Sequence, residues 1–154
     1  MEAPCRGAEL VTAAVGLAAV ACGAANILVW AGLYDGIEIG IMAIGGPDFF
    51  RWVWGSLVVV FGGVMMLAGA RQMHAVPGYG KVLLGVAMIG IIGGTDIFAL
   101  ICENIPAGEG AQFFNSATGF IGAFAPPYPP AVVLLPFALV IGCALYAGRA
   151  DDGC

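Results

Sequence analysis

Residues 81–106 read KVLLGVAMIGIIGGTDIFALICENIP, a mostly apolar run that carries an aspartate, Asp96, close to its middle. A transmembrane helix needs about 20 mostly apolar residues, so this run is long enough to cross a bilayer. A charged side chain inside a bilayer is costly, and it marks a candidate functional site by default. The environment of Asp96 is therefore the main question that the sequence raises.

The composition predicts that lipid is the solvent of this chain. Of its 154 residues, 61% are hydrophobic and only 10% are charged. One water-soluble core cannot bury that much apolar surface. The 25 glycines agree, because small residues let membrane helices approach closely. We expect a single integral membrane domain over residues 1–154.

Several function classes are excluded or disfavoured. The net charge of −5 leaves no basic surface for nucleic acid. The five cysteines form no CxxC pair and there is one histidine, so no metal site or disulfide framework is predicted. The sequence has no HExxH, no phosphate-binding loop and no recognisable nucleophile with its base, so we expect no cofactor and no catalysis by this chain alone.

The apolar runs predict an all-α polytopic membrane protein, an antiparallel bundle of four transmembrane helices at about residues 10–33, 50–70, 82–104 and 131–147. A short interfacial or re-entrant helix is expected over residues 109–124, before the last span. Arg6 followed by an apolar run and Cys22 also resembles a secretory or lipoprotein signal. The run continues past Cys22, which favours an uncleaved first span.

Small residues mark the faces on which helices are expected to meet. Gly90 and Gly94 form a GxxxG pattern in the third span, and Ala14 and Ala18 recur four residues apart in the first. Both patterns favour close helix contact. Asp48 directly precedes the second span, where it is expected to cap the helix.

The distribution of basic residues predicts the orientation. With four spans, Arg6, Arg71, Lys81 and Arg149 fall on one side and Arg51 alone on the other. Because cytoplasmic segments are enriched in Lys and Arg, both termini are expected in the cytoplasm, with the protein in the cell membrane.

Asn26 in the first span is expected at a depth similar to that of Asp96. No Lys or Arg lies well inside a predicted span, so we expect no ion pair for Asp96 within the chain. Asp96 then is a neutral acid bonded to Asn26, Thr95 or backbone, lines a water path, or meets a basic group of another subunit. Glu103, seven residues later on the same helical face, either extends such a path or marks the exit into water.

Two functional classes remain. In the first, the chain is a non-catalytic subunit packed within a larger membrane complex, such as an energy-converting or ion-translocating one. In the second, it is a small homo-oligomeric translocator of protons, cations or small solutes that uses Asp96. We favour the first, because one acid without a second polar span is little for a self-contained path. The expected partners are the lipid bilayer and other membrane subunits.

Overall fold

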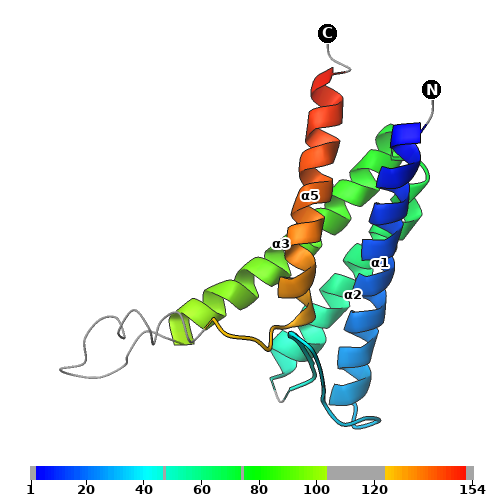
Figure 1. Cartoon of the computed structure of the whole chain (residues 1–154). Helices are drawn as coiled ribbons and strands as arrows, with labels where there is room; N and C mark the ends of the chain where they lie inside the picture. Colours follow the sequence, from blue (N-terminus) through cyan, green and yellow to red (C-terminus); the bar gives the residue numbers. More distant parts are fainter. Residues whose placement is uncertain (1–2, 47, 74, 104–123, 152–154) are drawn as a thin grey trace, which may run out of the picture.

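The computed structural model describes residues 3–46, 48–73, 75–103 and 124–151 (Figure 1). Most of them lie in four long helices, and a short π-helix, η1, runs directly into the second of these. Two short strands lie between the first helix and η1. In chain order the elements are α1 (Ala3–Trp30), β1 (Ile37–Ile39), β2 (Met42–Ile44), η1 (Phe50–Trp54), α2 (Gly55–Ala70), α3 (Val76–Glu103) and α5 (Pro130–Asp151).

Four helices in the described part of the chain are long and apolar enough to cross a membrane: Gly7–Trp30, Phe50–Ala70, Val76–Cys102 and Pro130–Gly148. This agrees with the predicted polytopic helical membrane protein and indicates an integral membrane location. The third helix begins at Val76, before the predicted start at residue 82. Pro77 lies in its first turn, where a missing N–H removes no helical hydrogen bond.

Neighbouring helices approach each other through glycines. α1 packs on α2, α2 on α3 and α3 on α5, and α1 also contacts α5. A Cβ atom at Gly63 of α2 would lie 2.6 Å from the carbonyl oxygen of Gly16 in α1. One at Gly85 of α3 would lie 2.5 Å from the carbonyl oxygen of Gly62 in α2. Larger residues at these positions would force the helices apart.

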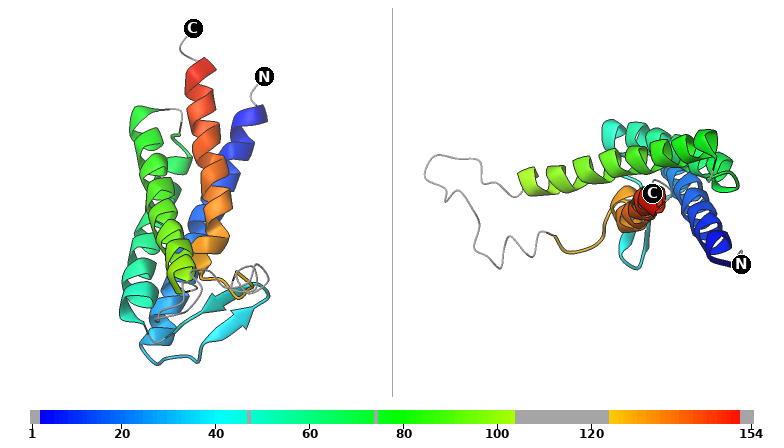
Figure 2. Two further views of the ribbon diagram at one scale, coloured as in Figure 1. Left: turned by 90° about the vertical axis from the view of Figure 1, so that its left-hand side faces the viewer. Right: turned by 90° about the horizontal axis from the view of Figure 1, so that it is seen from above.

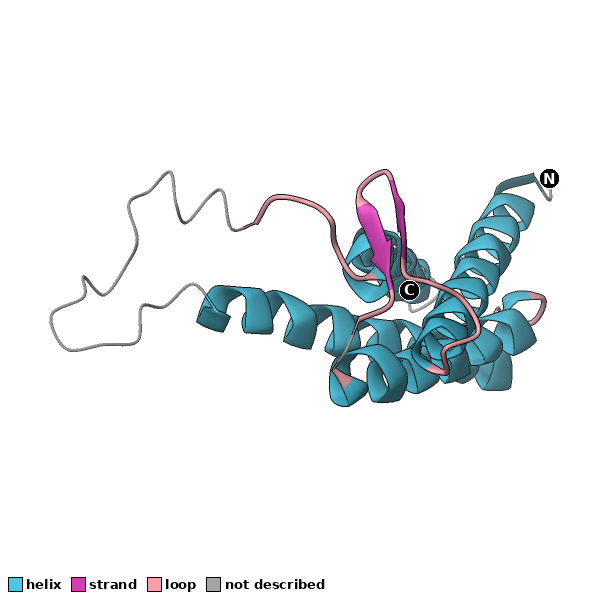
Figure 3. Cartoon of the chain, turned by 90° about the horizontal axis from the view of Figure 1, so that it is seen from below, coloured by secondary structure: helices cyan, strands magenta, loops and turns pink. Residues whose placement is uncertain are grey.

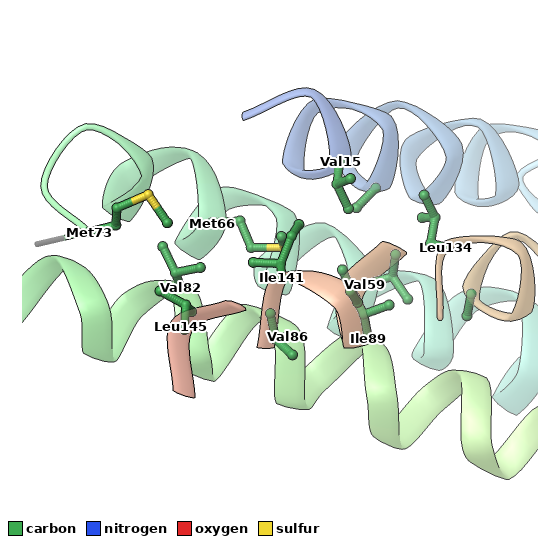
Figure 4. Close-up of a cluster of buried hydrophobic side chains, with 13 residues drawn as sticks. Val15, Val59, Met66, Met73, Val82, Val86, Ile89, Leu134, Ile141 and Leu145 are labelled. Carbon is green, nitrogen blue, oxygen red and sulfur yellow. The ribbon is translucent and has the colours of Figure 1, made fainter. Parts of the chain in front are cut away.

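The core lies where the four long helices meet (Figure 4). Met66 and Ile89 are completely enclosed in it. The outward faces are apolar too: Leu17 is 62% exposed, Ile91 64% and Val140 67%. Helices that are apolar on all sides are typical of membrane spans, because lipid solvates their outer faces.

The small residues of α1 divide between two faces. Ala14 is exposed, and Ala18 packs against the edge of the core. The face of α1 against α2 carries Gly16, Ala19 and Gly23, all of them buried. The contact between the two helices therefore centres on a second stripe, spaced at three and four residues.

β1 and β2 form an antiparallel hairpin, which the all-α prediction did not include (Figure 3). Its two-residue turn begins with Gly40 at φ 61°, as type II′ hairpin turns require. On the far side of β2, the Ala43 N–H donates to the Tyr128 carbonyl at 2.9 Å, and the Tyr128 N–H donates to the Ile41 carbonyl at 2.7 Å. The hairpin and the segment before α5 thus lie together across one end of the bundle (Figure 2).

The helix predicted over residues 109–124 lies outside the described residues, apart from Phe124, which is in a turn.

Candidate functional site

Asp96 is paired within the chain. The Nε atom of Arg51 in η1 lies 3.5 Å from Oδ1 of Asp96 in α3, with the two side chains 22% and 9% exposed. The expectation that no base of this chain reaches Asp96 is therefore wrong. The sequence puts Arg51 at the outer end of the second span, but its side chain turns inward and joins the start of that span to α3.

η1 gives Arg51 this direction. Oδ1 of Asp48 accepts the N–H groups of Phe50 at 2.9 Å and of Arg51 at 3.3 Å, which confirms the predicted cap. Within η1, the Gly55 N–H donates to the carbonyl oxygen of Phe50, five residues earlier. Such a wide turn brings residues five positions apart onto nearly the same face. Arg51 and Ser56 are such a pair, and both line one cavity.

Asn26 of α1 joins the hairpin to α2. It is only 4% exposed, and its side-chain amide donates to Oγ of Ser56 at 3.0 Å. Its Oδ1 accepts the N–H of Gly45, which follows β2, at 2.9 Å. Buried amides are costly unless they are bonded, and here both the donor and the acceptor side are used. The partners of Asn26 are therefore Ser56 and Gly45, and not Asp96.

These groups surround one small cavity. Asn26, Arg51, Ser56 and Asp96 line it together with residues at the start of α5, including Pro130 and Ala131. Its free space is about 10 Å³, close to the lower limit for a single water molecule. We refer to the four polar side chains, Asn26, Arg51, Ser56 and Asp96, as the polar cluster.

Two positive groups lie beside the cavity that Asp96 lines. One is the guanidinium of Arg51, which stays charged in proteins. The other is the N-terminal end of α5, because a helix N-terminus carries partial positive charge and Ala131 of its first turn lines the same cavity. A buried carboxylate is tolerated when such partners surround it.

The other residues singled out from the sequence lie apart from the cluster. Oγ1 of Thr95 donates to the carbonyl oxygen of Ile92 at 2.8 Å, and the Thr95 side chain is exposed. Glu103 is the last residue of α3, about 10 Å along the helix from Asp96. A Cβ atom at Gly90 or Gly94 would meet nothing within 4 Å. The GxxxG face of α3 thus points away from the other described helices.

Sequence reasoning missed Arg51 and Ser56 as members of the cluster. In an α-helix, residues five apart point in different directions, so nothing suggested that these two share a face. Two features of the sequence could have pointed to Arg51. Asp48 locates the start of the helix, and Arg51 is the only basic residue on that side of the predicted spans.

Chemically, the polar cluster consists of two pairs around one cavity: Asn26 with Ser56 links α1 to α2, and Arg51 with Asp96 links η1 to α3. Among the described residues, no three His, Cys, Asp or Glu side chains are placed to hold a metal ion. No known protein family, curated protein or solved structure matches the chain.

Proposed function

We propose that this chain is a non-catalytic integral membrane subunit, an antiparallel four-helix bundle that packs within a larger membrane protein complex. The complex is of an energy-converting or ion-translocating kind. The chain's part in it is to present a helix face to a neighbouring subunit and to hold that helix rigidly in place.

The observation that carries this proposal is the open glycine face of α3, made of Gly90, Gly94 and the following Phe98. A Cβ atom at either glycine would meet nothing within 4 Å, and Phe98 is 65% exposed. Elsewhere the chain places glycines where two helices touch, as at Gly16 and Gly63. Glycines on a helix face that no described helix covers fit contact with a helix from another subunit, because small residues permit close backbone approach in lipid.

The polar cluster suits a structural role. Arg51 and Asp96 compensate each other's charge, and Asn26 is bonded on both sides. The remaining space is about 10 Å³, too little for a hydrated ion. The ion pair also removes the need for a basic group from a partner to neutralise Asp96, so we place the partner contact on the glycine face instead.

A second candidate function is a small homo-oligomeric translocator of protons, cations or small solutes that uses Asp96. The observation in its favour is that polar side chains from several helices meet around a water-sized space. Ionisable groups inside membrane proteins often mark such paths. On this hypothesis the Arg51–Asp96 pair has to open during transport.

We place both termini in the cytoplasm and the chain in the cell membrane. α1 begins and α5 ends at the same end of the bundle, which is also where α2 passes into α3 (Figure 1). Arg6, Arg71, Lys81 and Arg149 belong to segments at this end, and the excess of basic residues favours the cytoplasmic side.

The test is site-specific photo-crosslinking in native membranes. Phe98→p-benzoylphenylalanine puts a crosslinker of nearly the same shape on the glycine face. Phe137 of α5, which is 54% exposed, is the matched control position. We expect a crosslink from position 98 to a different membrane protein, and none from position 137. Crosslinks only to a second copy of this chain would favour the translocator. Crosslinks to lipid alone at both positions would refute the subunit proposal.

A further inference from the structure

The β1–β2 hairpin has one apolar face, set by its register. Ile37 lies opposite Ile44, and Ile39 lies opposite Met42. Residues directly opposite in an antiparallel pair share one face of the sheet. That face is turned toward α1, because the thiol of Cys22 lies 4.0 Å from the sulfur of Met42. Ile44 is accordingly almost completely buried.

The apolar face continues beyond the helices that it covers. Ile37 is 49% exposed and Ile39 58% exposed, although their cross-strand partners pack inward. β2 pairs with β1 on one side and with Tyr128 on the other, so β1 is the outermost strand in the part of the chain that the structure describes. The opposite face carries Glu38 and Ala43. The hairpin is thus an amphipathic ribbon that projects sideways from the end of the bundle (Figure 3).

The depth of the ribbon follows from its contacts with α1. Cys22, which touches Met42, lies eight residues before Trp30 and thus about 12 Å deeper along the helix, inside the apolar span Gly7–Trp30. The rings of Trp30 and Phe49 stack edge to face at 5.5 Å, and both are exposed. Exposed aromatic rings at the end of a span mark the membrane–water interface. The apolar face of the ribbon therefore lies level with the last turns of a span, below this aromatic marker.

We propose that the β1–β2 hairpin is an interfacial membrane element, with Ile37 and Ile39 against phospholipid acyl chains and Glu38 on the headgroup side. Amphipathic elements of this kind bury their apolar face at the boundary between headgroups and acyl chains. The hydrocarbon centre is excluded, because no described strand pairs with the outer edge of β1, and the backbone groups of that edge need polar partners. The contact adds to the lipid-facing surface of the four helices and is independent of the partner proposed for α3.

The test measures which reagent reaches each methyl group in the unmodified chain, reconstituted in phosphatidylcholine nanodiscs. Isoleucine and alanine methyl groups are isotope-labelled, and the signals are assigned with Ile37→Val and Ile39→Val. Two paramagnetic reagents are compared, a lipid with a doxyl group near its headgroup and a water-soluble gadolinium chelate. The half-buried methyl of Ala43 is the control for the opposite face, and that of Ile44 is the control for burial in protein.

We expect the doxyl lipid, and not the gadolinium chelate, to abolish the Ile37 and Ile39 methyl signals. The chelate should weaken the Ala43 signal, and neither reagent should abolish that of Ile44. Loss of the Ile37 and Ile39 signals with the chelate would put this face in water and overturn the proposal. If the Ile37 and Ile39 signals persist with both reagents, protein covers this face, and the proposal is also overturned.

Discussion

The Arg51–Asp96 pair gives the sharpest prediction about stability. Asp96→Asn leaves a guanidinium in the bundle without its counter-charge, and Arg51→Gln leaves a carboxylate in the same position. Removing one partner of a fully buried pair costs about 3–5 kcal/mol, whereas replacing both by neutral groups is often harmless. Because the Arg51 side chain keeps 22% of its exposure, water screens it in part. We therefore expect each single variant to lose about 2–3 kcal/mol, and the double variant to stay within about 1 kcal/mol of the wild type.

The assay is reversible unfolding in mixed micelles, with dodecyl sulfate added to dodecyl maltoside and helicity followed by circular dichroism. On these values the coupling free energy of the cycle should be about 3 kcal/mol or more. Glu38→Gln, on the exposed strand β1, is the control and should change nothing measurable. If Asp96→Asn and Arg51→Gln each cost less than about 0.5 kcal/mol and do not couple, the two groups do not form a buried pair, and the reasoning fails.

Three other predictions concern packing, the hairpin and orientation. Gly63→Ala should destabilise the bundle by about 1–3 kcal/mol, because its Cβ would lie 2.6 Å from a carbonyl oxygen of α1. Gly90→Ala is the control and should not destabilise it, because a Cβ there would meet nothing within 4 Å. Equal unfolding curves for the two variants would contradict the helix contact. Asn26→Ala should cost about 1–3 kcal/mol and speed amide exchange at Gly45, since the buried hydroxyl of Ser56 and the half-buried N–H of Gly45 lose their partner. Unchanged exchange would refute the link. In a background without the native cysteines, an impermeant maleimide added outside intact cells should label Asp35→Cys and not Ala75→Cys, both of which are exposed positions. The reverse result would invert the orientation.

The four spans were predictable because each rests on a long apolar run, which lipid requires whatever the local packing. Their ends were less certain. Residues 71–81 contain Pro77 and two glycines, so they look like a turn, yet α3 begins at Val76. Proline breaks a helix interior but is compatible with a first turn.

The site was predictable only in part, for geometric reasons. Asp96 and Asn26 stand out as polar residues in apolar spans, and the structure places both on one cavity. Arg51 joins them because η1 is a π-turn, and a period of 3.6 residues does not describe that geometry. The hairpin was missed because three-residue strands leave little pattern, and their pairing with Tyr128 is distant in sequence.

Lipid should solvate the outer faces of these helices, and spin labels at exposed positions near the middle of three spans measure whether it does. Leu17, Ile91 and Val140 are each more than 60% exposed, and each is replaced singly by a labelled cysteine in the background without native cysteines, reconstituted in liposomes. We expect all three labels to be relaxed strongly by oxygen, which concentrates in the bilayer, and hardly at all by a water-soluble nickel chelate. Strong relaxation by the nickel chelate at these three positions would show that water, and not lipid, surrounds the helices.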